Sequence, residues 1–199
     1  CPPDLRAAYV QRIVDMARDK DISVAGSLVT ETTEMAVANS LGTRAYFAST
    51  RAMLTCVATG PDSSGYAEET CTDLSKIDPT RVAETAISKC LLSKNPSSVV
   101  PGEYDVILEP TAVADMILYL ALLGFTADRL QDGSSFLCGR MGEKIAGEDV
   151  TIWDDGLDPQ GLMMPFDFEG VPKEKVVLIE NGIAKGAVYD SLAAAKEGR

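Results

Sequence analysis

The stretch VVLIENGIAKGAVY, residues 176–189, is the strongest fold signal in this sequence of 199 residues. Two runs rich in apolar and β-branched residues, 176–179 and 183–189, flank the turn Glu180-Asn181-Gly182. Asn and Gly both tolerate positive φ angles, so an Asn-Gly pair favours the type I′ turn that joins neighbouring antiparallel strands. The stretch therefore predicts a hairpin, and with it an antiparallel sheet in the C-terminal half.

The N-terminal half carries a similar mixture of strand and helix signals. Residues 22–57 are dominated by Val, Thr, Ala and Ser, which predicts two or three strands broken at the turn 39–42, and a further strand follows at 65–74. Pro2-Pro3-Asp4 opens one helical pattern, and Asp78-Pro79 opens another with a cap residue followed by a first-turn proline. Strands and helices come in clusters without regular alternation. We therefore predict an α+β fold with mixed or antiparallel sheets and packed helices.

A linker rich in Ser and Pro at residues 95–102 divides the chain into two expected domains, 1–95 and 96–199. After it, residues 104–108 are expected to form a short buried strand. Residues 110–123 predict a helix that is apolar nearly all round, and such a helix belongs inside a structure, covered on several sides. On this interpretation Leu123→Glu would unfold the chain, because an unpaired charge in a buried helix is strongly unfavourable.

Composition excludes several classes of function. The sequence has 30 Asp and Glu against 18 Lys and Arg, a net charge of −12, which argues against nucleic acid and anionic membranes as partners. There is no histidine, so His-ligated zinc and triads built on histidine are excluded. No signal peptide is recognised, and the most apolar stretch, 116–125, is half the ~20 residues of a membrane span. We expect a soluble, cytoplasmic protein.

The five cysteines do not form a recognisable framework. Their number is odd and no pair has the C-x-x-C spacing, so neither a disulfide scaffold nor a zinc knuckle is indicated. Reduced thiols are the expected state. Cys56 and Cys71 could face each other across paired strands.

Two weak patterns leave a self-sufficient hydrolase open as an alternative. Ser134 or Ser135 with Lys144 could act as a Ser–Lys dyad, since a desolvated lysine can serve as a base. Carboxylates around Asp154 and Glu169 could perform acid–base chemistry or bind a hard cation, although the EF-hand spacing is absent. Neither pattern matches a phosphate-loop or catalytic motif.

The second half of the chain resembles the TldD/PmbA family, long labelled modulators of DNA gyrase. The string GEYDVILEP at 102–110 is similar to the family's G-x-Y-D-V-v-L-x-P motif. Further matching motifs follow in the family's order, at residues 127–129, 133–135, 139–143, 151–156, 166–170 and 178–186. The resemblance implies a PmbA/TldD-like α+β fold, with residues 1–95 as the end of an N-terminal domain and 96–199 as the beginning of the C-terminal one.

The resemblance also places the family's zinc motif on the apolar helix. The zinc-bearing subunit has His-Glu-x-x-x-His there, and counting back from Asp128 puts these positions at Leu118, Tyr119 and Leu123. None of the three supplies a ligand nitrogen or a carboxylate base. The chain therefore resembles the PmbA/TldE branch, which implies no catalytic residue, no metal and no cofactor in this subunit.

Membership of that branch would make the chain a catalytically silent subunit in proteolysis of unfolded peptides. Its partner would be a TldD-like zinc peptidase subunit or a second copy of itself. The motif residues Asp128, Ser135, Asp167, Glu169 and Gly170 are then candidates for a peptide channel or an interface. An alternative is a homo-oligomeric peptide-binding or scaffold protein. Family members extend further at both ends, so the chain resembles a fragment of the full length.

Overall fold

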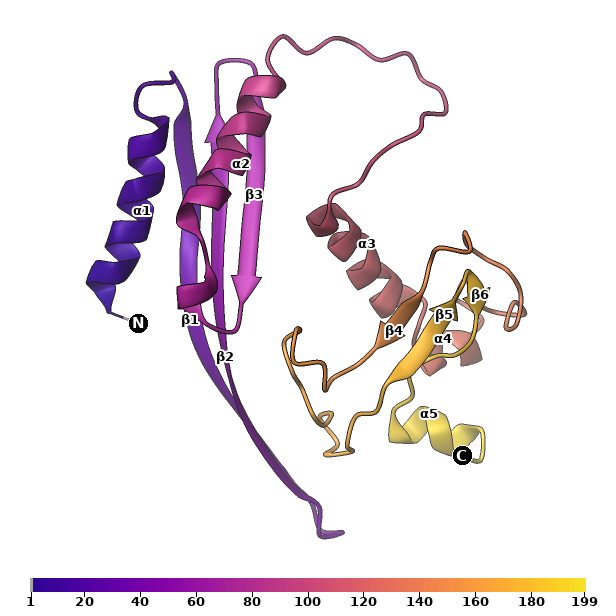
Figure 1. Ribbon diagram of the computed structural model, residues 1–199. Helices are drawn as coiled ribbons and strands as arrows, with labels where there is room; N and C mark the ends of the chain where they lie inside the picture. The colour runs from indigo at the N-terminus through magenta and orange to yellow at the C-terminus, as the bar shows by residue number, and fades with distance from the viewer. Residues whose placement is uncertain (1) are drawn as a thin grey trace. The chain divides into compact units, whose positions relative to one another are not determined.

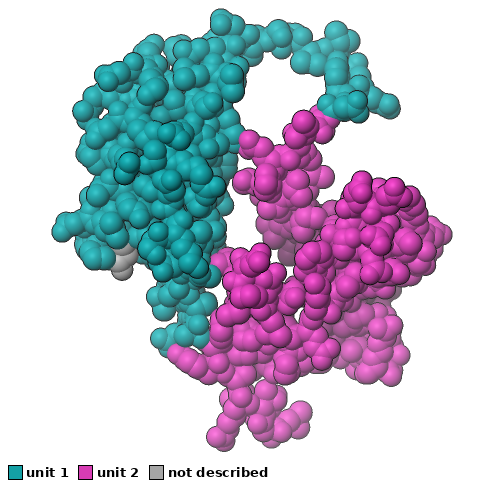
Figure 2. Space-filling view, in the orientation of Figure 1, with its two compact units in different colours: residues 1–34, 48–105 teal, residues 35–47, 106–199 magenta. Residues whose placement is uncertain are grey.

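The computed structural model describes residues 2–199, and its contacts divide the chain into two compact units (Figures 1 and 2). Unit 1 comprises the residues up to Glu34 together with Ala48–Asp105, and unit 2 comprises Met35–Phe47 together with Val106–Arg199. Each unit has its own three-stranded sheet. The observed class is α+β, as predicted. The expected domain boundary at residues 95 and 96 lies in the exposed linker that follows α2 and stays a prediction.

Unit 1 is a sheet with helices packed on one face. Its strands are β1 (Ser23–Ala38), β2 (Arg44–Thr59) and β3 (Ser64–Cys71), in that spatial order, and β3 gives way to a 3₁₀ turn at Leu74–Lys76. The helices α1 (Pro3–Ala17) and α2 (Pro79–Leu92) lie along this sheet in Figure 1. Alternate residues of β2 are buried beneath them, as the period of two in a strand requires. These residues are Ala52, Leu54, Cys56 and Ala58.

The register of β2 and β3 corrects one expectation about the cysteines. Cys56 lies opposite Ala67, and Cys71 lies opposite Ala52, so the two thiols do not face each other. Both are free, and burial raises the pKa of the Cys56 thiol. The expectation was wrong because a strand sequence fixes which residues share a face but does not fix the register with its neighbour.

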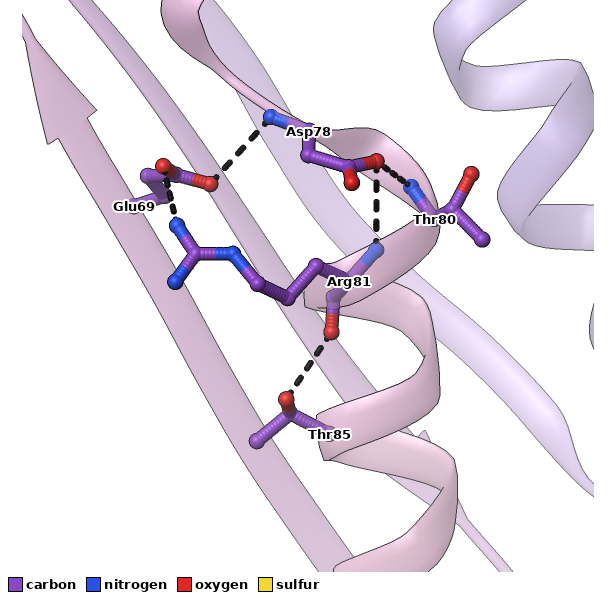
Figure 3. Close-up of polar contacts among 5 residues, drawn as sticks. All are labelled: Glu69, Asp78, Thr80, Arg81 and Thr85. Carbon is purple, nitrogen blue, oxygen red and sulfur yellow. Dashed lines mark hydrogen bonds and ion pairs between the residues drawn. The ribbon is translucent and has the colours of Figure 1, made fainter.

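The start of α2 is fixed by a polar network that ties the helix to β3 (Figure 3). Asp78 Oδ1 accepts hydrogen bonds from the backbone N–H groups of Thr80, at 2.9 Å, and Arg81, at 3.3 Å. Glu69 accepts hydrogen bonds from the Arg81 guanidinium and, at 3.3 Å, from the Asp78 backbone N–H. The helix start predicted at Asp78-Pro79 is thus present as a capped helix, and the cap residue is also bound by Glu69 of the sheet.

We expect the Asp78 cap to give unit 1 an acid-dependent stability. The backbone N–H groups of Arg81 and Thr80 lower the pKa of Asp78, with a smaller contribution from the Arg12 charge. A lowered folded-state pKa stabilises the fold above the unfolded pKa of about 3.9, and this stabilisation is lost as pH falls through the folded value. Thermal unfolding of wild type and Asp78→Asn between pH 2 and 7 checks this. The difference between the two should shrink at the acid end, and parallel profiles would contradict it.

Unit 2 is built around the hairpin that the sequence predicts. Its sheet has the order β4-β5-β6, with β4 (Ile152–Asp154), β5 (Val176–Glu180) and β6 (Ile183–Ala184) antiparallel. Asn181 and Gly182 have φ angles of 48° and 78°, as a type I′ turn requires. The helices of this unit are α3 (Pro110–Leu123), α4 (Ala127–Gln131) and α5 (Ser191–Lys196). Its core consists of Phe125, Leu137, Leu178, Ile179 and Ala184.

Two expectations about burial in the segment after the linker were wrong. Residues 104–108 form no strand, and Ile107 is fully exposed. The helix 110–123 is present as α3, but none of its residues is buried, although its sequence is apolar. Hydrophobicity predicts burial only where another layer covers the segment. Among the described residues, Leu120 and Ala121 of α3 are partly buried against the core of unit 2, and most of the helix is exposed.

No helix among residues 2–199 is both long enough and apolar enough to cross a bilayer.

Candidate functional site

The three positions to which the resemblance assigns the zinc motif lie on α3. Leu118, Tyr119 and Leu123 are 55%, 64% and 60% exposed. Their spacing along the helix places them within about 140° of its circumference, so they share one side of α3. That side offers two aliphatic side chains and a phenol. Among the described residues, no group of three His, Cys, Asp or Glu is placed to hold a metal ion.

Ser135 is held at the C-terminal end of α3 and is buried, at 6% exposure. Its hydroxyl donates a hydrogen bond to the Gly124 carbonyl at 2.6 Å and accepts one from the Leu137 backbone N–H at 3.0 Å. Lys144, its proposed partner in a Ser–Lys dyad, is exposed and lies 3.9 Å from Glu148. The contacts of Ser135 therefore fix the loop after α3 and do not prepare a nucleophile.

We expect the Ser135 hydroxyl to stabilise unit 2 measurably. Ser135→Ala leaves the Gly124 carbonyl and the Leu137 N–H without this partner, which typically costs about 1–3 kcal/mol for buried groups. Ser134→Ala is the matched control, because Ser134 is exposed and its hydroxyl donates a hydrogen bond to another exposed side chain, Asp132, at 2.5 Å. Urea unfolding followed by the fluorescence of Trp153, the one tryptophan of the sequence, reports on unit 2. Equal effects of the two substitutions would contradict the assignment.

Asp128 lies in the first turn of α4, a short distance along the chain from Ser135. A hydrogen bond from the Thr126 side chain is the main cause that lowers the pKa of Asp128. Arg129 lies 3.9 Å from both Asp128 and Asp132, and its Nε atom is buried without a hydrogen-bond partner. Sequence reasoning did not single out Arg129, although it belongs to the motif at 127–129. Asp128 is therefore an ionised carboxylate that lies beside the Arg129 guanidinium.

Asp167, Glu169 and Gly170 come together in one turn. Asp167 Oδ1 accepts hydrogen bonds from the backbone N–H groups of Glu169 and Val171, each at 2.9 Å. The Gly170 N–H donates to the Asp167 carbonyl at 3.0 Å. Glu169 Oε2 accepts a hydrogen bond from the Ser191 N–H at the start of α5, at 2.8 Å. The carboxylates of Asp167 and Glu169 thus bind backbone N–H groups and hold the turn in shape.

The carboxylate pair of the hydrolase alternative is engaged in two separate contacts. Asp154 Oδ2 lies 3.3 Å from the Lys173 ammonium, whereas Glu169 binds the first residue of α5. A glycosidase-type pair needs two carboxylates that face each other across the scissile bond. The contacts of Asp154 and Glu169 give no support to such a pair.

Comparison with known proteins covers nearly the whole chain. The model of the PmbA/TldA metallopeptidase central domain matches residues 2–93, and that of the C-terminal domain matches residues 101–199. A metalloprotease of Methanothermobacter thermautotrophicus is 30% identical over 92% of this chain and 43% of its own length. A protein of Methanocaldococcus jannaschii, described as uncharacterized, is 40% identical over 48% of this chain and 23% of its own. The chain thus spans less than half the length of these relatives.

Solved structures agree in fold. TldE from Thermococcus kodakarensis superposes on all of this chain with a TM-score of 0.79 and 30% identity, over 47% of its own length. A Thermotoga maritima protein named as a modulator of a DNA gyrase superposes with a TM-score of 0.85 and 24% identity, over 48% of its length. Both contain the fold of this chain as about half of a longer one.

Proposed function

Because this chain belongs to the PmbA/TldD family of metallopeptidases, we propose that it is a non-metal-binding subunit of a TldD/TldE-type zinc peptidase. In this proposal the chain is catalytically silent by itself, and the assembly degrades unfolded peptides. The observation that carries the proposal is the identity of three residues on α3. Leu118, Tyr119 and Leu123 stand where the zinc-bearing branch is expected to have its two histidines and its glutamate.

The chemistry of these side chains supports the proposal. A catalytic zinc ion needs about three protein ligands and one open position for water. Two leucines provide no donor atom at all, and one phenol cannot replace two imidazoles. A general base is also missing, because Tyr119 takes the place of the carboxylate. This side of α3 therefore fits a subunit that leaves the chemistry to its partner.

The motif residues keep their proposed place at a peptide channel or at an interface. Asp128 carries an exposed carboxylate that would accept a main-chain N–H group of an extended peptide. Asp167 and Glu169 already accept backbone N–H groups of this chain and would act through the turn that they hold. Ser135 and Gly170 would act through backbone geometry, since the Ser135 hydroxyl already has two backbone partners. A net charge of −12 disfavours nucleic acid as a partner, and we propose a cytoplasmic location.

Affinity capture tests the assignment of a partner. The tagged chain is expressed in its native cytosol, and the proteins that co-purify are identified and quantified by mass spectrometry. The proposal expects a larger family member with His-Glu-x-x-x-His in a 1:1 ratio to this chain. Recovery of the chain alone or only with copies of itself would overturn it and favour the homo-oligomeric scaffold.

A peptidase assay tests the catalytic silence. The purified chain, with zinc and an unfolded casein substrate, is expected to show no activity above the buffer. Activity that survives EDTA and is lost in Ser135→Ala or Glu169→Gln would instead establish the self-sufficient hydrolase. The stability of each variant, measured in parallel, separates a catalytic loss from unfolding.

A further inference from the structure

The tip of the β1–β2 hairpin, residues 35–47, has one face that is more protected than the other. Along both strands the half-buried residues alternate with exposed ones. The tip belongs to unit 2, whereas the rest of both strands belongs to unit 1 (Figure 2). The half-buried residues are Met35, Val37, Thr43, Ala45 and Phe47. A single face of mostly apolar residues, protected inside unit 2, is the pattern of a docked strand pair.

The turn at residues 167–171 lies directly against this face. Gly170 has a φ angle of +82°, and a Cβ atom added there would lie 2.6 Å from Thr43 Cγ2 and 3.2 Å from Val37 Cγ1. The backbone of the turn therefore touches the side chains of the tip, and no side chain at position 170 would fit between them. The positive φ angle is a second, independent reason for glycine at this position.

Asp167 shapes the turn for this contact. Its carboxylate accepts the N–H groups on either side of Gly170, those of Glu169 and Val171. These bonds hold the loop closed, so that the Gly170 backbone is presented at its apex. Glu169 attaches the same turn to the start of α5 through Ser191. The dock is therefore anchored to α5 within unit 2.

We propose that the hairpin tip is a strap, and that the turn 167–171 is the dock on which it closes. In this proposal Asp167 fixes the shape of the turn, and Gly170 leaves the space that the side chains of the hairpin tip occupy. The docked face consists of side chains that are only half-buried, and in this proposal the strap opens without unfolding either unit. The inference does not depend on the proposed peptidase function, because it concerns contacts within this chain alone.

Hydrogen–deuterium exchange followed by mass spectrometry tests the strap. Gly170→Val places a branched side chain where the tip lies, and peptides from residues 35–47 should exchange about tenfold faster than in wild type. Peptides from the buried part of β2, residues 52–58, should not change. Gly161→Ala is the matched control, because a Cβ atom there meets no atom closer than 3.6 Å. Unchanged exchange at 35–47 in Gly170→Val, or equal acceleration in the control, would overturn the proposal.

A second variant covers the case in which Gly170→Val unfolds unit 2 as a whole. Val37→Asp changes only the strap and places a charge against the turn. The amides of residues 168–171 should then exchange faster, while the Trp153 fluorescence transition of unit 2 keeps its midpoint. If the turn amides keep their wild-type protection in Val37→Asp, the strap does not dock on this turn.

Discussion

Replacing Phe125 with alanine is expected to lower the free energy of unfolding of unit 2 by about 3–5 kcal/mol. Phe125 is 1% exposed and lies in the core of unit 2. Its ring meets the ring of Phe136 edge to face, with centroids 5.4 Å apart. Truncation removes this contact and leaves a cavity between α3, α4 and the sheet. The surrounding side chains are close-packed and relax only partly into it. The midpoint of the Trp153 fluorescence transition in urea measures the loss.

Phe168→Ala is the matched control for this substitution. The same atoms are removed, but Phe168 is 82% exposed and belongs to the loop before β5. Its replacement should change the stability of unit 2 by no more than about 0.5 kcal/mol. Similar losses in the two variants would mean that Phe125 is not the centre of the core.

Gly65→Val is expected to destabilise unit 1 by about 3 kcal/mol or more. A Cβ atom at this position would lie 2.0 Å from the Ala86 carbonyl oxygen and 2.5 Å from the Cys90 backbone N. Both atoms belong to the main chain of α2, so no side-chain rotation can relieve the clash, and the helix must move away from β3. Overpacking that forces side-chain and backbone shifts costs about 1–3 kcal/mol and occasionally more, and a contact with main-chain atoms on two sides belongs at the upper end of this range.

Far-UV circular dichroism and Trp153 fluorescence separate the two units in this experiment. The part of the dichroism signal that comes from α1 and α2 should be lost at lower urea concentration, whereas the part from the helices of unit 2 and the Trp153 transition should stay in place. Gly102→Ala in the linker, where a Cβ atom meets nothing closer than 3.6 Å, serves as the control. A shifted Trp153 transition in Gly65→Val would show that the two units unfold together.

Turn and cap chemistry was readable from the sequence because it is local. Asn181-Gly182 forms a type I′ turn through the φ preferences of two residues, and Asp78-Pro79 starts a helix through the nearest backbone N–H groups. The Val, Thr, Ala and Ser content of residues 22–57 likewise indicated strands, which the structure has as β1 and β2. These features led to the α+β class, which the structure confirms.

Burial and register were not readable in the same way. Residues 104–108, expected as a strand, are exposed, and the helix at 110–123 has no fully buried residue, because burial depends on a covering layer that hydrophobicity alone does not supply. The pairing of Cys56 with Ala67 depends on how β3 aligns with β2, and a shift of two residues leaves every face pattern unchanged.

For the candidate site, too, some properties follow from the sequence and others only from the tertiary structure. The sequence by itself determines that Leu118, Tyr119 and Leu123 carry no imidazole and no carboxylate in any conformation. Only the tertiary structure decided that the Ser135 hydroxyl is held by Gly124 and Leu137, and that Gly170 lies against Val37 and Thr43. Side-chain chemistry is a property of each residue, whereas the contacts of Ser135 with Gly124 and of Gly170 with Val37 and Thr43 exist only once different segments of the chain have packed.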